Sequence, residues 1–279
     1  MNKINGFTVI VPSFGSADRA VISAAKQWFG KEYDYKIEIL IFDDDVEYRD
    51  ENKKSRYEYL LDYKTDNVDI KIIENKEHLY QGKCRVLGAE MATYDWVFFM
   101  DSDDEYTPFC MRSVYDMLTD YYSKKDHKKV ASVGYNFLGF DVKNFHPIGD
   151  KQFSIWVQGR CWNRKFILEH NLHTIYERGV NSKCAEDYPF VALFDYYVQH
   201  EQDEWESLLA NFPTPLAYWF PNYDSLSRQP HYGQHLAGFT MRSSCVIYRL
   251  MKEYNEQIGL TPEEDEFLKK KILNMTIYS

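Results

Sequence analysis

The chain has 279 residues, of which 44% are apolar and 17% aromatic, enough to bury a substantial core in one large or two modest domains. It carries 33 Lys and Arg against 43 Asp and Glu, and a net charge of −10 disfavours a polyanion such as nucleic acid as partner. Five scattered cysteines without a C-x-x-C pair predict neither a disulfide framework nor a zinc ribbon, so we interpret them as reduced thiols of a cytoplasmic protein.

No stretch approaches the roughly 20 apolar residues that a membrane helix needs. The apolar run near the N-terminus ends at Pro12, which is typical of a strand rather than of a signal peptide.

Four short segments of the first hundred residues are predicted strands, because β-branched and aromatic residues follow one another almost without a break, as in strands buried on both faces. These segments are residues 7–12, 36–42, 68–73 and 96–100. Segments of helical periodicity alternate with them at residues 17–29, 52–63 and 82–94. The alternation predicts the α/β class, with a doubly wound, mostly parallel sheet of Rossmann-like type.

The second half of the chain begins with a predicted helix and then loses the regular alternation. Helices are expected over residues 108–123, 163–171 with Asn163 as N-cap, and 184–199, and strands over 130–140, 152–159 and 215–221. From about residue 234 the chain is predicted to be helical, with a capping box at residues 261–264. We expect a main domain over residues 1–232, with halves at 1–105 and 106–232, and a helical extension over 233–279.

Two groups of carboxylates follow predicted strands. Asp43 and Asp44 come after the second strand, and Asp101 and Asp103 after the fourth. The carboxyl ends of parallel strands meet at one edge of a sheet, where ligands of such folds bind. Residues i and i+2 of an extended segment point the same way, so Asp101 and Asp103 are expected to face one cation together while Ser102 turns back.

Paired carboxylates suit Mg²⁺ or Mn²⁺, which share their coordination shell with substrate phosphates. A structural interpretation stands beside each functional one. D-x-D by itself is more often a solvated strand-to-turn junction, and an Asp at a strand end is often a helix cap. The position of both groups on one sheet edge favours a nucleotide site, in which Asp43 accepts hydrogen bonds from a base or a ribose hydroxyl.

The order and spacing of five motifs resemble the family-2 glycosyltransferases, which are inverting enzymes of the GT-A fold. FTVIVPSFG resembles their V-I-I-P-T-Y-N strand, IEILIFDDD their E-I-I-V-V-D-D-G segment, and KCRVLGAEMATYDWVFFMDSDD their A-R-N-x-G to D-S-D-D segment. IWVQGRCWNRKFILEHNL resembles their acceptor-side W and R-x-F-L segment, and CAEDYPF their G-E-D-x-x-F motif. The resemblance covers roughly residues 7–230 and implies a nucleotide-sugar half (1–105) and an acceptor half (106–232).

On the donor side, the resemblance implies that Asp43 binds the base, with Pro12 and Phe14 as the neighbouring wall and Asp44 beside them. Arg85 is implied to contact the nucleotide or its diphosphate. At the D-x-D motif, Asp101 and Ser102 are implied to contact the ribose or sugar, and Asp103, with Asp101, the metal. His231 is a candidate third metal ligand.

On the acceptor side, the resemblance implies Asp187 as the general base and Glu186 as a supporting residue. The metal would neutralise the diphosphate leaving group while Asp187 removes the proton of an attacking hydroxyl, and one in-line displacement would invert the anomeric carbon. The protein is therefore expected to transfer a hexose or N-acetylhexosamine from a UDP-linked donor to a glycan, a cell-wall polymer or a lipid-linked acceptor. It is expected in the cytoplasm or at the inner face of the membrane, with peripheral membrane contact and a homodimer through the C-terminal helices as further expectations.

Several alternatives stay open at this point. Phe14 stands where the family usually has Tyr, and Val86 where it has Asn, so the base is less firmly predicted than the metal site. A nucleotidyltransferase would carry a Gly-rich phosphate loop, which residues 11–20 match poorly. A dehalogenase-type phosphatase would carry D-x-D on its first strand rather than its fourth. A non-catalytic relative, or a transferase acting on modified DNA or on protein, completes the alternatives.

Overall fold

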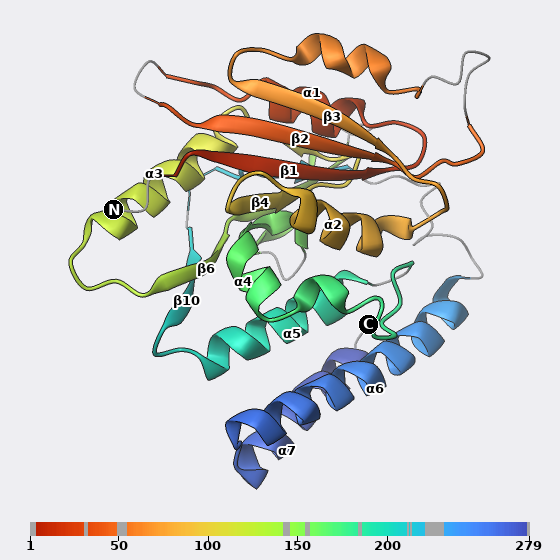
Figure 1. Cartoon of the computed structure of the whole chain (residues 1–279), viewed down its shortest axis with the longest axis vertical. Helices are drawn as coiled ribbons and strands as arrows, with labels where there is room; N and C mark the ends of the chain where they lie inside the picture. The colour runs from red at the N-terminus through yellow and green to blue at the C-terminus, as the bar shows by residue number, and fades with distance from the viewer. Residues whose placement is uncertain are drawn as a thin grey trace.

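A seven-stranded sheet forms the centre of the molecule in the computed structural model (Figure 1). The structure describes residues 4–30, 33–48, 55–141, 146–153, 157–183, 186–210, 212, 214–220 and 232–277. The strands lie in the order β10-β6-β9-β4-β1-β2-β3. Their bounds are β1 Gly6–Ser13, β2 Lys36–Asp43, β3 Val68–Glu74, β4 Trp96–Phe99, β6 Lys129–Gly134, β9 Arg160–Asn163 and β10 Trp205–Leu209.

Most neighbouring strands of this sheet are parallel. β3, β2, β1 and β4 run the same way, β9 is antiparallel to both β4 and β6, and β10 is parallel to β6. The four predicted strands of the first half are β1 to β4, and the predicted α/β class with a mostly parallel sheet is confirmed.

Helices cover both faces of the sheet (Figure 1). Side chains of α1 and α3 join the core on one face, and side chains of α2, α4 and α5 join the core on the other. These helices are α1 Asp18–Ala25, α2 Tyr80–Met91, α3 Cys110–Ser123, α4 Arg164–Glu169 and α5 Asp187–His200. The predicted N-cap of α4 is confirmed, because the side chain of Asn163 accepts hydrogen bonds from the backbone N–H groups of Lys165 and Phe166.

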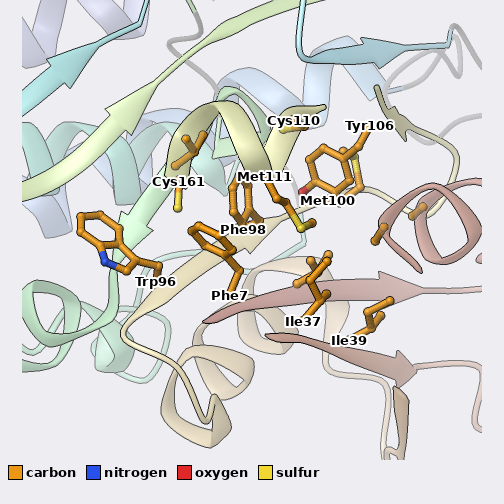
Figure 2. Close-up of a cluster of buried hydrophobic side chains, with 14 of the residues drawn as sticks. Phe7, Ile37, Ile39, Trp96, Phe98, Met100, Tyr106, Cys110, Met111 and Cys161 are labelled. Carbon is orange, nitrogen blue, oxygen red and sulfur yellow. The ribbon is translucent and has the colours of Figure 1, made fainter. Parts of the chain in front are cut away.

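The central strand β1 and its neighbours β2 and β4 are mostly apolar because successive side chains enter opposite cores, whereas the edge strand β3 alternates buried and exposed residues. In β1, Val9 and Val11 belong to the core beneath α1 and α3, whereas Ile10 belongs to the core beneath α2. Figure 2 shows the first of these cores, where Phe7 and Phe98 meet Met111 of α3. Burial on both faces fixes the strand register, and with it the positions of the polar residues at the strand ends.

A second sheet of four strands, in the order β5-β11-β7-β8, follows the first half. Its strands are β5 Glu105–Tyr106, β7 Asn136–Asp141, β8 His146–Phe153 and β11 Ala217–Trp219. The strand-like pattern predicted over residues 130–140 is confirmed, but it forms two strands in two sheets, because the chain passes at Tyr135 from β6 of the central sheet to β7 of the second. The strand predicted over 152–159 is wrong in part, since residues 157–159 form the short 3-10 helix η2 (Val157–Gly159).

Two further differences concern local structure. The described part of the helix predicted over residues 52–63 is the 3-10 helix η1 (Glu58–Tyr63), because apolar spacing of three and four residues does not separate the two helix types. A further 3-10 helix, η3, spans Leu172–Thr174. Strand β10 was not predicted, because its sequence WESLL resembles helix-flanking sequence as much as a strand.

The C-terminal helices α6 (Tyr232–Ile258) and α7 (Pro262–Ile277) form a hairpin beside α5 (Figure 1). Ile247, Leu250 and Met251 of α6 belong to the same apolar core as α2 and α5. The predicted capping box is confirmed, since Thr261 and Glu264 exchange backbone-to-side-chain hydrogen bonds. Among the described residues, no helix is both long and apolar enough to cross a bilayer.

Candidate active site

The carboxyl ends of β1, β2 and β4 bring the predicted donor-side residues to one edge of the sheet. Ser13 of β1 pairs with Asp43 of β2, and Met100 follows β4 and donates its backbone N–H to Ile10 of β1. The side chain of Asp43 is fully buried and accepts hydrogen bonds from the Ser55 hydroxyl (2.9 Å) and from the backbone N–H of Asp45 (3.3 Å). Asp43 is therefore oriented by its surroundings at the predicted base site.

Asp44 has a structural role that its prediction as a nucleotide contact did not include. Its carboxylate accepts hydrogen bonds from the backbone N–H groups of Leu79 (2.7 Å) and Tyr80 (2.8 Å) and from the Asn75 side chain (2.8 Å). His78 lies against the same carboxylate, with its Nδ1 atom 2.6 Å from Oδ2. Asp44 thus holds the start of α2, which is the helix-capping alternative considered for it.

The predicted wall of the base site consists of one buried and one exposed residue. Pro12 is buried in β1, whereas the side chain of Phe14 is 65% exposed. Gly15 follows with a φ of +113°, a conformation that side chains rarely adopt. The ring of Phe14 lies 5.3 Å from that of His78, so an aromatic face is presented at the ends of β1 and β2.

The D-x-D segment is a turn and not an extended strand. The backbone N–H of Asp104 donates to the carbonyl oxygen of Asp101 at 3.1 Å, which closes a β-turn over residues 101–104. The predicted extended conformation of residues 101–103, in which the side chains of Asp101 and Asp103 would point to one side, is therefore wrong, because β4 ends at Phe99. Asp101, Ser102 and Asp103 are partly exposed in this turn.

Asp104 is the residue of this segment to which the sequence analysis gave no role. It is fully buried, its Oδ1 atom accepts from the backbone N–H of Phe220 (3.2 Å), and its Oδ2 atom has no hydrogen-bond partner among the described residues. Burial, and then the charges of Asp101 and Asp103, raise the pKa of Asp104 well above its ordinary value. Such an excess of buried negative charge is relieved by a proton or by a cation.

The turn fits a hard divalent cation. Its donors are carboxylate oxygens, which Mg²⁺ and Mn²⁺ prefer, and a buried carboxylate oxygen remains unsatisfied beside them. Within the described ranges, no group of three or more His, Cys, Asp or Glu side chains is arranged as a metal site. An ion that takes much of its shell from phosphates and water needs only one or two carboxylates. His231 lies outside the described residues.

Arg85 of α2 joins the D-x-D turn to the acceptor-side motif. Its Nη2 atom bonds Oδ1 of Asp101 at 2.5 Å, and its Nη1 atom bonds Oε1 of Glu186. The other oxygen of Asp101 accepts from Nε2 of Gln158 (2.6 Å), and the backbone carbonyl of Glu186 accepts from the Tyr176 hydroxyl (2.9 Å). Residues 85, 101 and 186, far apart in the chain, thus lie in one hydrogen-bonded cluster.

Asp187 follows Glu186 and is the first residue of α5. Burial, and then the neighbouring charge of Glu186, raise the pKa of Asp187 to about 7, against the opposing effect of Arg85. Burial also raises the pKa of Glu186, again against Arg85. A carboxylate with a pKa near neutrality has the proton affinity that a general base requires.

Three supporting residues escaped the sequence analysis. Gln158 lies in a segment predicted to be a strand, and Tyr176 in a segment to which no element was assigned, so no pattern indicated either one. The third is Gly82, a glycine within the predicted helix of residues 82–94, and this signal was not used. In the structure, a Cβ atom at this position would lie 2.8 Å from the Tyr176 ring and 2.9 Å from Cγ of Glu186. Only glycine lets α2 approach the acceptor-side motif this closely.

Comparisons with known proteins agree with this arrangement. The sequence model of the family described as Glycosyl transferase family 2 matches residues 8–125. A search of curated proteins found no match. Among solved structures, S. aureus TarS 1-349 in complex with UDP is similar with a TM-score of 0.61 and 13% identity, over 98% of this chain and 72% of that one. The complex of TarS 1-349 with UDP-GlcNAc gives a TM-score of 0.53 and 14% identity, over 98% and 80%.

The mostly parallel sheet, with acidic turns at its carboxyl edge, is the GT-A fold of these structures, as predicted. Residues 8–125 match the model of the family-2 glycosyltransferases, which agrees with the predicted resemblance to this family and with the prediction of a glycosyltransferase.

Proposed function

We propose that the protein transfers a sugar from a UDP-linked donor to an acceptor hydroxyl with inversion, and that it needs Mn²⁺ or Mg²⁺. One observation carries the proposal. Arg85 bonds both Asp101 of the D-x-D turn and Glu186 beside Asp187, so a donor-binding motif and a candidate base belong to one site. The titles of the TarS structures name UDP and UDP-GlcNAc as ligands of that protein, which makes them the first donors to test.

On the donor side, Asp43 would accept hydrogen bonds from the base, and the exposed ring of Phe14 would stack against it. Asp101 would bind the ribose or the sugar, and Asp103 would hold the metal ion. When bound, the ion supplies positive charge that stabilises the departing diphosphate. Pro12, Asp44 and Ser102 shape and support this half, and Asp44 acts through the start of α2.

On the acceptor side, the Asp187 carboxylate would remove the proton of the attacking hydroxyl as its oxygen forms the new bond to the anomeric carbon. The diphosphate leaves from the opposite face in the same step, so the configuration inverts and no covalent enzyme intermediate is formed. Glu186 and Arg85 orient the start of α5, and neither takes the proton.

The acceptor we propose is a glycan, a cell-wall polymer or a lipid-linked saccharide. A lipid-linked acceptor places the reaction at the cytoplasmic face of a membrane, with peripheral contact, and a homodimer could form through the outer faces of α6 and α7. Nucleic acid is disfavoured as acceptor by the net charge of −10.

Isothermal titration with UDP tests the donor assignment. Binding should require Mn²⁺, be lost in Asp103→Ala and persist in Asp187→Asn, because Asp103 is assigned to the metal and Asp187 is not. Asp66→Asn, at an exposed position away from these motifs, is the control. UDP-GlcNAc and other UDP-sugars are then screened for UDP release with each acceptor class. If no nucleoside diphosphate binds under any condition, the proposal is refuted.

A further inference from the structure

The guanidinium group of Arg85 is enclosed by carboxylates. Arg85 is only 4% exposed, and its two Nη atoms bond Asp101 and Glu186, while the buried Nε atom has no hydrogen-bond partner among the described residues. An arginine that binds a diphosphate presents its forked donors to the ligand. Here each Nη atom already donates to a carboxylate of the protein, and burial of the guanidinium restricts what its remaining N–H groups can reach.

Each carboxylate that accepts a hydrogen bond from Arg85 also accepts one from a glutamine side chain. Asp101 accepts a second hydrogen bond from Gln158, and Oε2 of Glu186 accepts one from Nε2 of Gln81 (3.3 Å). Among the described residues, Arg85 is the side chain that bonds both. Without its charge, the buried carboxylate of Glu186 and the partly exposed carboxylate of Asp101 would repel one another.

We propose that Arg85 is a positioning residue that couples the donor side of the site to the acceptor side. It sets the place of Asp101 through one Nη atom and that of Glu186, at the start of α5, through the other. A change at either carboxylate is thereby transmitted to the other through a single guanidinium group. This inference rests on the proposed function and replaces the diphosphate contact expected for Arg85 from the sequence.

The two roles of Arg85 differ in what a second substitution does. If Arg85 contacts the diphosphate, Arg85→Gln removes that contact whatever residue stands at position 186. If Arg85 keeps Asp101 in place by neutralising Glu186, the loss arises from the repulsion between the two carboxylates that Arg85→Gln leaves behind, while Gln158 still bonds Asp101. Glu186→Gln removes that repulsion, and the double variant has the same local net charge as the original site. Rescue therefore separates positioning from contact.

The experiment is a titration of UDP in the presence of Mn²⁺ with the full chain, Arg85→Gln, Glu186→Gln and the double variant. We expect Arg85→Gln to weaken UDP binding at least about tenfold, and the double variant to return to within about threefold of the original chain. Arg164→Lys is the matched control, because Arg164 also bonds α2 but at its C-terminal end, where it donates to the carbonyl oxygens of Ala89 and Glu90. It should leave UDP binding unchanged.

A double variant that binds UDP as weakly as Arg85→Gln overturns the inference, as does an Arg85→Gln variant that binds UDP normally. If Arg85→Gln does not fold, the double variant is compared with Glu186→Gln alone. Positioning predicts equal UDP binding by these two variants, and a diphosphate contact predicts weaker binding by the double variant. An unsubstituted chain that binds no UDP refutes the proposed function itself, and that result is distinct from a failed rescue.

Discussion

Asp187→Asn should abolish transfer and yet stabilise the protein at alkaline pH. The pKa of Asp187 is raised from 3.8 to about 7 by burial and by Glu186, so the folded protein holds this proton more tightly than the unfolded chain does. The contribution of protonated Asp187 to the free energy of unfolding is complete below the pKa of the unfolded chain, 3.8. It is lost as pH rises through the pKa of the folded protein, about 7. A pKa difference of about 3, at about 1.4 kcal/mol for each unit, gives an upper limit of about 4 kcal/mol at pH 8.

Asparagine at position 187 is neutral at every pH, so the variant avoids the free-energy cost of ionising a buried carboxyl group. Between pH 5 and pH 8 only about two pH units of this pKa difference accumulate, so urea unfolding should show Asp187→Asn gaining about 1–3 kcal/mol relative to the original chain. Asp66→Asn, an exposed carboxylate, should show no such difference. In the original enzyme kcat should rise with pH through about 7 and then level off, and Asp187→Asn should lose about 10²–10⁴-fold in rate. If the variant gains nothing in stability between pH 5 and pH 8, the reasoning from burial is refuted.

Three further substitutions test the fold that carries the site. Gly88→Ala places a Cβ atom 2.5 Å from Cγ2 of Ile10 and should cost about 1–3 kcal/mol in urea unfolding as α2 is forced from β1; full stability would contradict this packing. Glu38 is buried, which raises its pKa, but hydrogen bonds led by that of Lys71 hold the pKa below its ordinary value. The stabilisation by ionised Glu38 is present above the pKa of the unfolded chain and is lost as pH falls through the pKa of the folded protein. Glu38→Gln should therefore make unfolding, followed by circular dichroism, less dependent on pH in the acid range. Leu250→Ala should cost about 2–4 kcal/mol in one cooperative transition, whereas two transitions would show that the C-terminal hairpin unfolds separately.

Surface positions on the same elements provide the controls. Glu90→Ala on α2 and Lys252→Ala on α6 change exposed side chains and should remain within about 0.5 kcal/mol of the original stability.

The first half of the fold could be predicted because its signals are local. Strands buried on both faces are apolar throughout, and the segments between them have helical period, so β1 to β4, α1 and α2 follow from residues close together in the chain. The second half depends on pairings that no local pattern encodes. Strand β9 is antiparallel between two strands from distant segments, and Tyr135 marks a change of sheet within an unbroken strand-like run.

The residue types of the site were predicted, but their partners were not. The acidic groups at the strand ends predicted where a ligand would bind, since only topology was needed to bring Asp43 and Asp101 to one edge. The turn at Asp101 to Asp104 and the enclosure of Arg85 depend on side chains such as Gln158, which lie far away in sequence. A motif records which residue stands at a position and not which neighbours it bonds, so the contacts of Arg85 with Asp101 and Glu186 could not be predicted.

The position of β9 determines how the site can open. This strand is hydrogen-bonded to β4 on one side and to β6 on the other, so a single continuous sheet joins β1 to β4, from the first half of the chain, to β6 and β10 from the second half. Rotating one half against the other would break this ladder, and the enzyme therefore has no interdomain hinge at this point. Donor entry and product release must be served by loops and side chains at the strand ends, which makes their rates sensitive to loop substitutions and insensitive to changes in the sheet.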